Sequence, residues 1–155
     1  MAVMQRGRVI QIGTPRALYL RPRSRFVANF LGETNLLSGH VKAASGETIQ
    51  VETQLGVMEG TSSAGTLTPG APAFCSVHPE SITLGIGKGP NRFRARVERE
   101  LFLGEVRHLY LKVGEIAITC YRLQIHADRP LIGAEVELTI DTEDVVVLPA
   151  GEIED

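Results

Sequence analysis

The sequence has no apolar run near the roughly 20 residues that a membrane-spanning helix needs, and its N-terminus has no charged-then-apolar signal pattern. These absences predict a cytoplasmic protein. The 155 residues suffice for one ordinary domain, or for a small domain with an extra segment, and exclude two full enzyme domains. A hydrophobic content of 43% and a charged content of 22% predict a folded chain with a real core.

Cysteine is scarce, and the two that occur, Cys75 and Cys120, stand alone in apolar stretches. No Cys-x-x-Cys pair and no histidine at ligand spacing accompanies them, so we expect two buried free thiols. Histidine is scattered without a His-Glu-x-x-His pattern, which leaves open only a metal site assembled from separate strands. The histidines are His40, His78, His108 and His126.

Patterns typical of catalysis are also absent. The sequence holds no Gly-x-Ser-x-Gly elbow and no cysteine with a nucleophile signature. The glycine-rich stretch 85–90 does not match a phosphate-binding loop, and we expect a plain turn there. Glu98 and Glu100 share one face of a strand and alternate with apolar residues, so we expect both to point to solvent. The sequence therefore predicts no catalytic residue, no cofactor and no metal ligand.

Charge is distributed unevenly along the chain. Residues 1–32 hold six arginines and no acid, whereas residues 135–155 hold eight acids and no base. The acidic end argues against a nucleic-acid surface there. The arginines are Arg6, Arg8, Arg16, Arg21, Arg23 and Arg25.

The first 32 residues predict a hairpin and two short helices. Gly7 separates two short apolar runs, which favours a hairpin ending at Gly13. Thr14 as N-cap, followed by a proline, predicts a helix over 15–20. Ser24 as N-cap predicts a second helix, and Gly32 fits a left-handed residue that ends it. The second helix carries an apolar stripe of Phe26, Val27, Phe30 and Leu31, and two such helices do not build a core alone.

From Glu33 onward, apolar residues recur at every second position between turn residues. Gly114-Glu115 is short enough for a tight turn, and segments 60–70 and 85–90 are expected to be open, mobile loops. Eight to ten short antiparallel strands without an interposed helix predict a mainly β fold, an OB-type barrel or a pair of small barrels. The alternating residues are Phe93, Ala95, Val97, Leu101, Leu103, Leu109, Leu111, Val113, Ile116, Ile118, Cys120, Val136, Leu138 and Ile140.

OB barrels can bind single-stranded nucleic acid by stacking bases on aromatic rings beside a basic groove. Aromatic content is only 5%, so this function is an alternative rather than the first choice. Its candidate residues are Phe93, Phe102, Tyr110 and Tyr121, flanked by Arg92, Arg94, Arg96 and Arg99.

The N-terminal stretch runs VMQRGRVIQIGTP from Val3 and continues with Leu18-Tyr19, Pro22 and FVANFLGE from Phe26, followed by Asn35. It resembles the end of the nucleotide-binding domain in ATPase subunits of bacterial ABC importers for polyamines, iron, sugars and related solutes. That family shows roughly V-M-x-x-G-x-I-x-Q-x-G-T-P-x-E-L-Y-x-x-P-x-x-x-F-V-A-x-F-L-G-x-x-N. Ala17 departs from it where a glutamate is common.

The remaining chain resembles the TOBE regulatory domain that follows in this family, a pair of small OB-like barrels. The resemblance rests on NLLSGHV at 35–41, VHPESI at 77–82 and LFLG at 101–104. His78 stands where the family usually has arginine, so this position lacks a permanent cation. The resemblance implies family-motif or regulatory contacts at Asn35, Gly39, His78, Pro79, Glu80, Phe102, Leu103 and Gly104.

The resemblance divides the chain into residues 1–32, the last elements of an ABC ATPase domain, and residues 33–155, a TOBE domain. The Walker A, signature and Walker B motifs and the switch histidine are absent, which implies no ATP hydrolysis. The implied function is a non-catalytic regulatory and dimerisation domain of an importer ATPase, present as a fragment or truncated gene product. A small-solute or oxyanion sensor at the barrel junction is the alternative beside nucleic-acid binding.

The implied partners are a second copy of the chain, the ATPase domain, membrane permease subunits and a small solute, whereas nucleic acid is not expected. The implied location is cytoplasmic and peripheral to the inner membrane. Without an ATPase domain, part of the N-terminal apolar surface lacks its usual support, so we expect residues 1–32 to be mobile or docked on a second copy. That surface consists of Val9, Ile12, Phe26, Val27 and Phe30.

Overall fold

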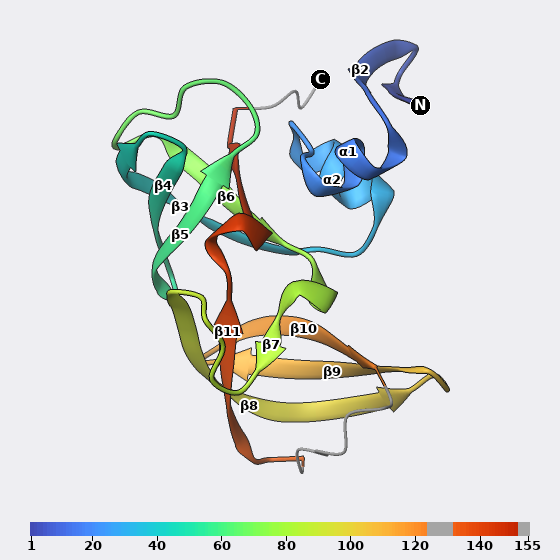
Figure 1. Ribbon diagram of the computed structural model, residues 1–155, viewed down its shortest axis with the longest axis vertical. Helices are drawn as coiled ribbons and strands as arrows, with labels where there is room; N and C mark the ends of the chain where they lie inside the picture. Colours follow the sequence, from blue (N-terminus) through green and yellow to red (C-terminus); the bar gives the residue numbers. More distant parts are fainter. Residues whose placement is uncertain (124–131, 152–155) are drawn as a thin grey trace.

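The computed structural model describes residues 1–123 and 132–151. Figure 1 shows two β lobes along the long axis of the molecule, with the N-terminal hairpin and helices beside one of them. The chain is mainly β with OB-like sheets, as the sequence predicted. No helix within the described ranges is long and apolar enough to cross a membrane.

The first lobe is a closed barrel with strand order β12-β5-β4-β3-β6, and the second lobe is a sheet with order β10-β9-β8-β11-β7. Described strand pairs are antiparallel except for a short parallel pairing of β5 with β12. Two 3-10 turns, η1 (Pro79–Ser81) and η2 (Thr142–Asp144), follow β6 and β11. The strands are β3 (Asn35–Ser45), β4 (Thr48–Thr53), β5 (Gly56–Ser62), β6 (Pro72–Val77), β7 (Thr83–Leu84), β8 (Asn91–Phe102), β9 (Val106–Val113), β10 (Ile116–Leu123), β11 (Glu135–Ile140) and β12 (Val145–Pro149).

The chain contains an internal structural repeat, whose first copy starts at β3 and whose second copy starts at β8. Residues 35–41 and 91–97 each begin with asparagine, carry an apolar residue two positions later and end on valine. The strands β3 and β8 both carry a β-bulge directly after that valine. Each then continues through three strands, a 3-10 turn and a short last strand. Inspection of the sequence missed this repeat because its similarity is concentrated in one seven-residue stretch.

The last strand of each repeat pairs in the other lobe (Figure 1). After η1 the chain forms β7, which pairs with β11 of the second lobe. After η2 it forms β12, which pairs with β6 and β5 of the first lobe. Neither lobe is therefore complete without a strand from the other repeat.

A buried asparagine at the start of the first repeat bonds across the lobes. The Nδ2 atom of Asn35 donates to the carbonyl oxygens of Val77 at 3.2 Å and Thr119 at 2.9 Å. Its Oδ1 atom accepts the backbone N–H of Thr119 at 2.8 Å. Because Thr119 lies on the edge strand β10, Asn35 satisfies backbone groups that no strand pairs with.

Asn91 makes the same contacts from the second repeat to the first. Its Nδ2 atom donates to the carbonyl oxygens of Glu59 at 2.9 Å and Ile140 at 3.1 Å, and its Oδ1 atom accepts the Glu59 N–H at 2.7 Å. Asn91 is 2% exposed. The two asparagines are thus equivalent cross-lobe contacts, related by the internal repeat.

One hydrophobic core extends through both lobes, from Val51 and Met58 in the first to Leu109 and Leu138 in the second. Both cysteines lie in this core as free thiols, as predicted. Burial raises the pKa of each thiol to about 12, so both stay protonated and unreactive near neutral pH.

The N-terminal segment contains the predicted hairpin, β1 (Ala2–Gln5) with β2 (Arg8–Ile12), and the predicted helices, α1 (Pro15–Leu20) and α2 (Arg25–Leu31). Thr14 Oγ1 accepts the Ala17 N–H at 3.1 Å. Ser24 Oγ accepts the Val27 N–H at 3.1 Å, so both predicted N-caps are confirmed.

The small core of this segment joins the hairpin to both helices through Val3, Leu18 and Val27, which are nearly fully buried. One expectation for the segment is wrong. Gly32 ends α2 in extended backbone with φ 172 rather than in the left-handed region. A Cβ at this position would lie 3.1 Å from a ring carbon of Tyr19, a tight contact that glycine avoids.

The segment docks on the first lobe of its own chain, a contact that the sequence did not predict. Ala28 packs against Val146 and Leu148 of β12, and the Arg25 guanidinium lies 4.5 Å from the centre of the Phe74 ring. Part of the apolar surface named above stays in solvent, because Val9, Ile12 and Phe30 are exposed.

Two details of the lobes also differ from the sequence prediction. The segment 60–70 is not all open loop, because β5 continues to Ser62 and Gly60 packs tightly against β12. Glu100 does not point to solvent like Glu98. The bulge between Val97 and Arg99 reverses the alternation, which places Glu100 beside Arg107 with Oε1 to Nε at 3.4 Å.

Asn91→Ala should lower the free energy of unfolding by about 2–4 kcal/mol, because it leaves backbone groups of Glu59 and Ile140 without their partner. Urea denaturation followed by circular dichroism measures the loss. Gln50→Ala is the control, since Gln50 also bonds to Glu59 but through a weaker side-chain contact at 3.3 Å. An equal loss in both variants would contradict a special role for Asn91.

Candidate functional site

Three of the residues singled out from the sequence lie together at η1. His78 follows the last residue of β6 and is the N-cap of η1, Pro79 occupies the first position of η1, and Glu80 follows it. Proline fixes the backbone φ that this turn needs and lacks an N–H that would have no partner there. The turn thereby presents His78 and Glu80 toward helix α1 of the N-terminal segment.

His78 is buried beneath α1. Its ring stacks on that of Tyr19 with a centroid distance of 3.9 Å and an interplanar angle of 5°. Its Nε2 lies 3.0 Å from the Tyr19 carbonyl oxygen, and its Nδ1 lies 3.4 Å from the Glu33 carbonyl oxygen. The Tyr19 hydroxyl donates to the Glu80 carboxylate, so His78 before η1 and Glu80 within it, two positions apart, both contact one tyrosine.

The second lobe joins the same cluster through β10. The Tyr121 hydroxyl donates to the carboxylate of Glu33, and the Tyr121 ring stacks on His108 at 3.7 Å. We name this cluster the His78 joint, because helix α1, the residue Glu33 after α2, the start of η1 and strand β10 meet in it. It consists of Tyr19, Glu33, His78, Glu80 and Tyr121.

The joint keeps both of its tyrosines protonated. Burial raises the pKa of Tyr19, and the hydrogen bond to Glu80 and the charge of that carboxylate raise it further. Burial likewise raises the pKa of Tyr121, with Glu33 as the next cause. The pKa of Asp144 in η2 is also raised, by burial first and then by its acidic neighbours Asp141 and Glu143. The region around the joint is therefore rich in carboxylates.

A cavity of about 540 Å³ adjoins the joint between η1, β7 and the ends of β9 and β10. Carboxylate, guanidinium and hydroxyl groups line it together with aliphatic side chains, so it suits a small solute with both polar and apolar parts. Its lining residues are Glu80, Ile82, Thr83, Leu84, Val106, Tyr121, Arg122 and Leu123.

The other predicted site residues lie elsewhere. Asn35 makes the cross-lobe contact described above, and Gly39 allows close packing, since a Cβ there would lie 2.3 Å from the Glu52 carbonyl oxygen. Phe102, Leu103 and Gly104 form the turn between β8 and β9, at the far tip of the second lobe (Figure 1). Phe102 and Leu103 are 57% and 54% exposed.

The residues considered for nucleic acid do not form one platform. Phe93 packs against the core, Arg99 covers the Tyr110 ring at 4.1 Å, and Arg96 pairs with Glu98 at 2.7 Å. No group of three or more histidine, cysteine or acidic side chains that could hold a metal ion occurs in residues 1–123 and 132–151. His126 lies outside these residues.

Sequence reasoning named His78 and Glu80 but not Tyr19, Glu33 and Tyr121 as parts of the site. The sequence placed Tyr19 in the first predicted helix and Glu33 just after the second. The contacts of these two residues, however, join positions 45 to 88 residues apart in the chain. No local pattern reports such pairings. Only the repeat, which aligns the two lobes, would have indicated that β10 approaches the start of β3.

Tyr19→Phe should loosen the N-terminal segment while keeping the ring stack on His78. Loss of one hydrogen bond to a carboxylate should destabilise the docking of α1 by about 1–2 kcal/mol. Faster hydrogen exchange of α1 amides measures this. Tyr110→Phe is the control, because its ring meets Arg99 and no described carboxylate accepts its hydroxyl.

The effect of Tyr19→Phe on stability should also depend on pH. Because the pKa of Tyr19 is raised above its ordinary value of 10.0, its contribution is complete below pH 10.0 and is lost as pH rises through the higher folded-state value. The stability difference between the native sequence and Tyr19→Phe should therefore shrink at alkaline pH. A constant difference from neutral pH upward would contradict the assignment.

Comparison with known proteins places this geometry in a family. Residues 75–148 match the family model of the TOBE domain. The spermidine/putrescine import ATP-binding protein PotA of Pseudomonas aeruginosa (strain UCBPP-PA14) is 38% identical over 111 residues, which cover 68% of this chain and 30% of that protein. Its namesake from Trichormus variabilis (strain ATCC 29413 / PCC 7937) is 36% identical over 126 residues, covering 76% and 32%.

A solved structure, the cytoplasmic molybdate-binding protein ModG with molybdate bound, has a TM-score of 0.62 and 15% identity, and covers 73% of this chain and 94% of that one. This likeness shows the fold alone. The chain spans about a third of the length of the curated relatives that it matches. It is a TOBE-domain protein related to the ATP-binding subunits of bacterial ABC importers.

Proposed function

We propose that this chain acts as a non-catalytic regulatory domain of an ABC importer ATPase subunit. The observation that carries the proposal is the His78 joint, in which Tyr19 of the N-terminal segment contacts His78 and Glu80, and Tyr121 of the second lobe contacts Glu33, the residue that directly follows that segment. A change in the relative position of the lobes would reach the N-terminal segment through these contacts. The relatives named for spermidine and putrescine import support the transport context.

In this proposal the chain has two parts with different origins. Residues 1–32 correspond to the last elements of the ATPase domain, and residues 33–155 form the regulatory domain. The expected partners are the ATPase domain, the membrane permease subunits and a second copy, at the cytoplasmic face of the inner membrane. The contact between the two parts is largely polar, which is typical of domain interfaces that move.

The proposal can be tested in a chimaera of the Pseudomonas aeruginosa subunit in which this chain replaces the matched region. Within an assembled importer, Tyr19→Phe and His78→Ala should change the ATPase rate by about fivefold or more, as expected for coupling of 1 kcal/mol. Gln50→Ala in the first lobe is the matched control. Unchanged rates in both joint variants, at normal expression, would overturn the proposal.

Solute sensing is the second candidate, favoured by the cavity of about 540 Å³ beside the joint. A solute bound there would contact Glu80 of η1 and Tyr121 of β10 together, and so both lobes. In the chimaera, sensing would appear as an ATPase rate that depends on added spermidine or molybdate. Glu80→Gln should then abolish a dependence on spermidine, whose ammonium groups the carboxylate attracts, and should not weaken a dependence on the anion molybdate.

We also propose that the chain forms a homodimer through the exposed β8–β9 turn. Leu101, Phe102 and Leu103 are all exposed there, and three adjacent large apolar residues favour a protein contact. Light scattering across a range of concentrations should show twice the monomer mass of 16.8 kDa.

Leu103→Asp should shift the chain toward monomer, because it places a charge in the contact. Ile86→Asp is the control, since Ile86 is also exposed but lies outside this turn. A strict monomer at every concentration, or equal effects of both variants, would contradict the proposed interface.

A further inference from the structure

The second lobe has an opening in its wall at the place where the first lobe is closed. In the first lobe β12 pairs with β5 in parallel, with Val146 opposite Thr61 and Val147 opposite Ser62. In the second lobe β7 and β10 are the two ends of the sheet, and no strand of the described ranges joins them. The cavity of about 540 Å³ lies at this opening, since β7 and the last three residues of β10 line it.

The cross-lobe asparagines show which residues of the two repeats correspond. They bond to the backbone of Glu59 in β5 and of Thr119 in β10. Gly60 and Cys120 follow directly, so they occupy equivalent positions. The two 3-10 turns are equivalent as well, and β12 after η2 therefore corresponds to β7 after η1.

The residue at this equivalent position differs between the lobes in a way that explains the opening. A Cβ at Gly60 would lie 2.5 Å from the Val145 carbonyl oxygen, so glycine lets β5 approach β12 closely. Cys120 brings a side chain to the same place in the second lobe, with Sγ 3.6 Å from the Ile82 carbonyl oxygen. This side chain stands between β10 and the residue before β7, where the first lobe has none.

Strand β10 directs backbone groups into the opening. The N–H and carbonyl groups of Thr119 point away from β9, since both bond to Asn35. Residues of an antiparallel pair alternate in this respect, so the backbone groups of Tyr121 and Leu123 point the same way. In the part of the chain that the structure describes, no strand pairs with this edge, and Leu123 is 54% exposed.

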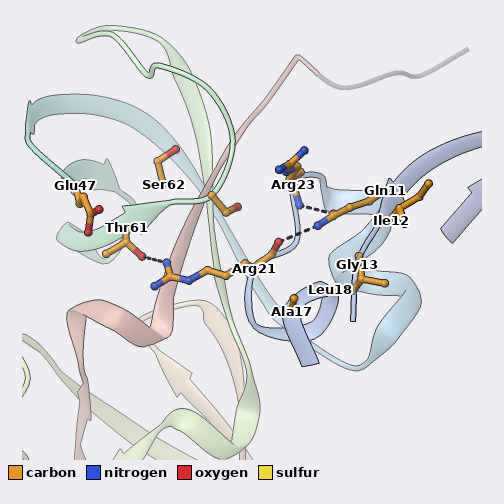
Figure 2. A pocket seen from close by; sticks show the side chains of 11 residues that line it. Gln11, Ile12, Gly13, Ala17, Leu18, Arg21, Arg23, Glu47, Thr61 and Ser62 are labelled. Carbon is orange, nitrogen blue, oxygen red and sulfur yellow. Dashed lines mark hydrogen bonds between the residues drawn. The ribbon is translucent and has the colours of Figure 1, made fainter. Parts of the chain in front are cut away.

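The corresponding edge of β5 in the first lobe is covered by other stretches of the chain. β12 pairs with it and directs Val145 and Val147 into the core. The link between α1 and α2 also reaches it, because Arg21 Nη1 donates to Thr61 Oγ1 at 2.6 Å (Figure 2). Both neighbours of this edge are polypeptide, and the repeat therefore indicates the class of ligand that the second lobe takes.

We propose that the opening between β7 and β10 binds an extended segment of a partner protein, which adds to the free edge of β10 as a strand. In such complexes backbone hydrogen bonds supply affinity, and pockets for alternate side chains supply specificity. The cavity is such a pocket, because Ile82, Leu84 and Val106 line it. The partner segment accordingly carries aliphatic side chains at every second position.

The segment would fill the cavity considered above for a solute, so the two ligands exclude each other. Its binding is measured on this chain alone and does not depend on the proposed regulation of an ATPase. A suitable probe is the synthetic peptide acetyl-EDVVVLP-amide, which has the sequence Glu143–Pro149 and reproduces the strand that fills this position in the first lobe.

Isothermal titration of the full chain with this peptide should show saturable binding below about 1 mM. The amides of β10 should exchange hydrogen more slowly in its presence. Methylating the peptide nitrogens one at a time should weaken binding about fivefold or more at alternate residues only, because every second residue of an added strand bonds to the edge.

Cys120→Gly should weaken peptide binding about tenfold or more, because β7 can then approach β10 and close the opening. Cys120→Ser keeps the size of the side chain and should bind as the native sequence does. Cys75→Gly is the matched control, since Cys75 is equally buried but does not line the cavity.

Absence of heat up to about 1 mM peptide, or equal losses on methylation at every residue, would overturn the proposal. Binding that survives Cys120→Gly in a chain that circular dichroism shows to be folded would overturn it as well. If that variant does not fold, the methylated peptides decide on the native sequence. Heat with spermidine but none with the peptide would replace the strand by a solute.

Discussion

Two buried asparagine side chains hold the lobes of this protein together, and the other contacts between them depend on that arrangement. Each amide group both donates and accepts, and each meets one residue on a strand whose edge is open at that point. Thr119 lies on the edge strand of the second lobe, and Glu59 lies where β5 has no pairing with β12. A short side chain with an acceptor and two donors suits this task. At these two residues, backbone groups on an open strand edge are thereby paired within the molecule.

The asparagine contacts also set the position of the His78 joint. Asn35 bonds to Thr119, and Tyr121 lies two residues further along the same strand, on the same face. Fixing β10 against the start of β3 therefore brings the Tyr121 hydroxyl to Glu33, just before that strand. The exchange of β7 and β12 between the lobes fixes η1 in the same way, because η1 is the connection that crosses. The contacts that pack the lobes against each other therefore also set the geometry of the His78 joint.

What could be predicted from the sequence follows from the range of each interaction. The helix caps at Thr14 and Ser24 act over three residues, and the sequence predicted both. The conformation of Gly32 was predicted wrongly, and its packing against the Tyr19 ring, thirteen positions away, is a contact that the local pattern does not report. The prediction that Glu100 points to solvent was also wrong. A β-bulge before it reverses the alternation of the strand, and the sequence pattern did not indicate that bulge. The strand exchange and most of the joint depend on residues far apart in the chain, which periodicity does not report.

Charge explains how the N-terminal segment and the lobes fit together. The segment carries six arginines and no acid, whereas the remaining chain carries more acids than bases, so their opposite net charges favour association. The contacts that fix the segment are nevertheless mostly hydroxyl groups and rings, as in Arg21 with Thr61 and Tyr19 with His78. Such contacts are short-ranged and directional, and the apolar area beneath Ala28 is small. These few contacts therefore fix the orientation of the segment on the first lobe. Because they are few, a ligand or a shift of one lobe can alter the position of the segment.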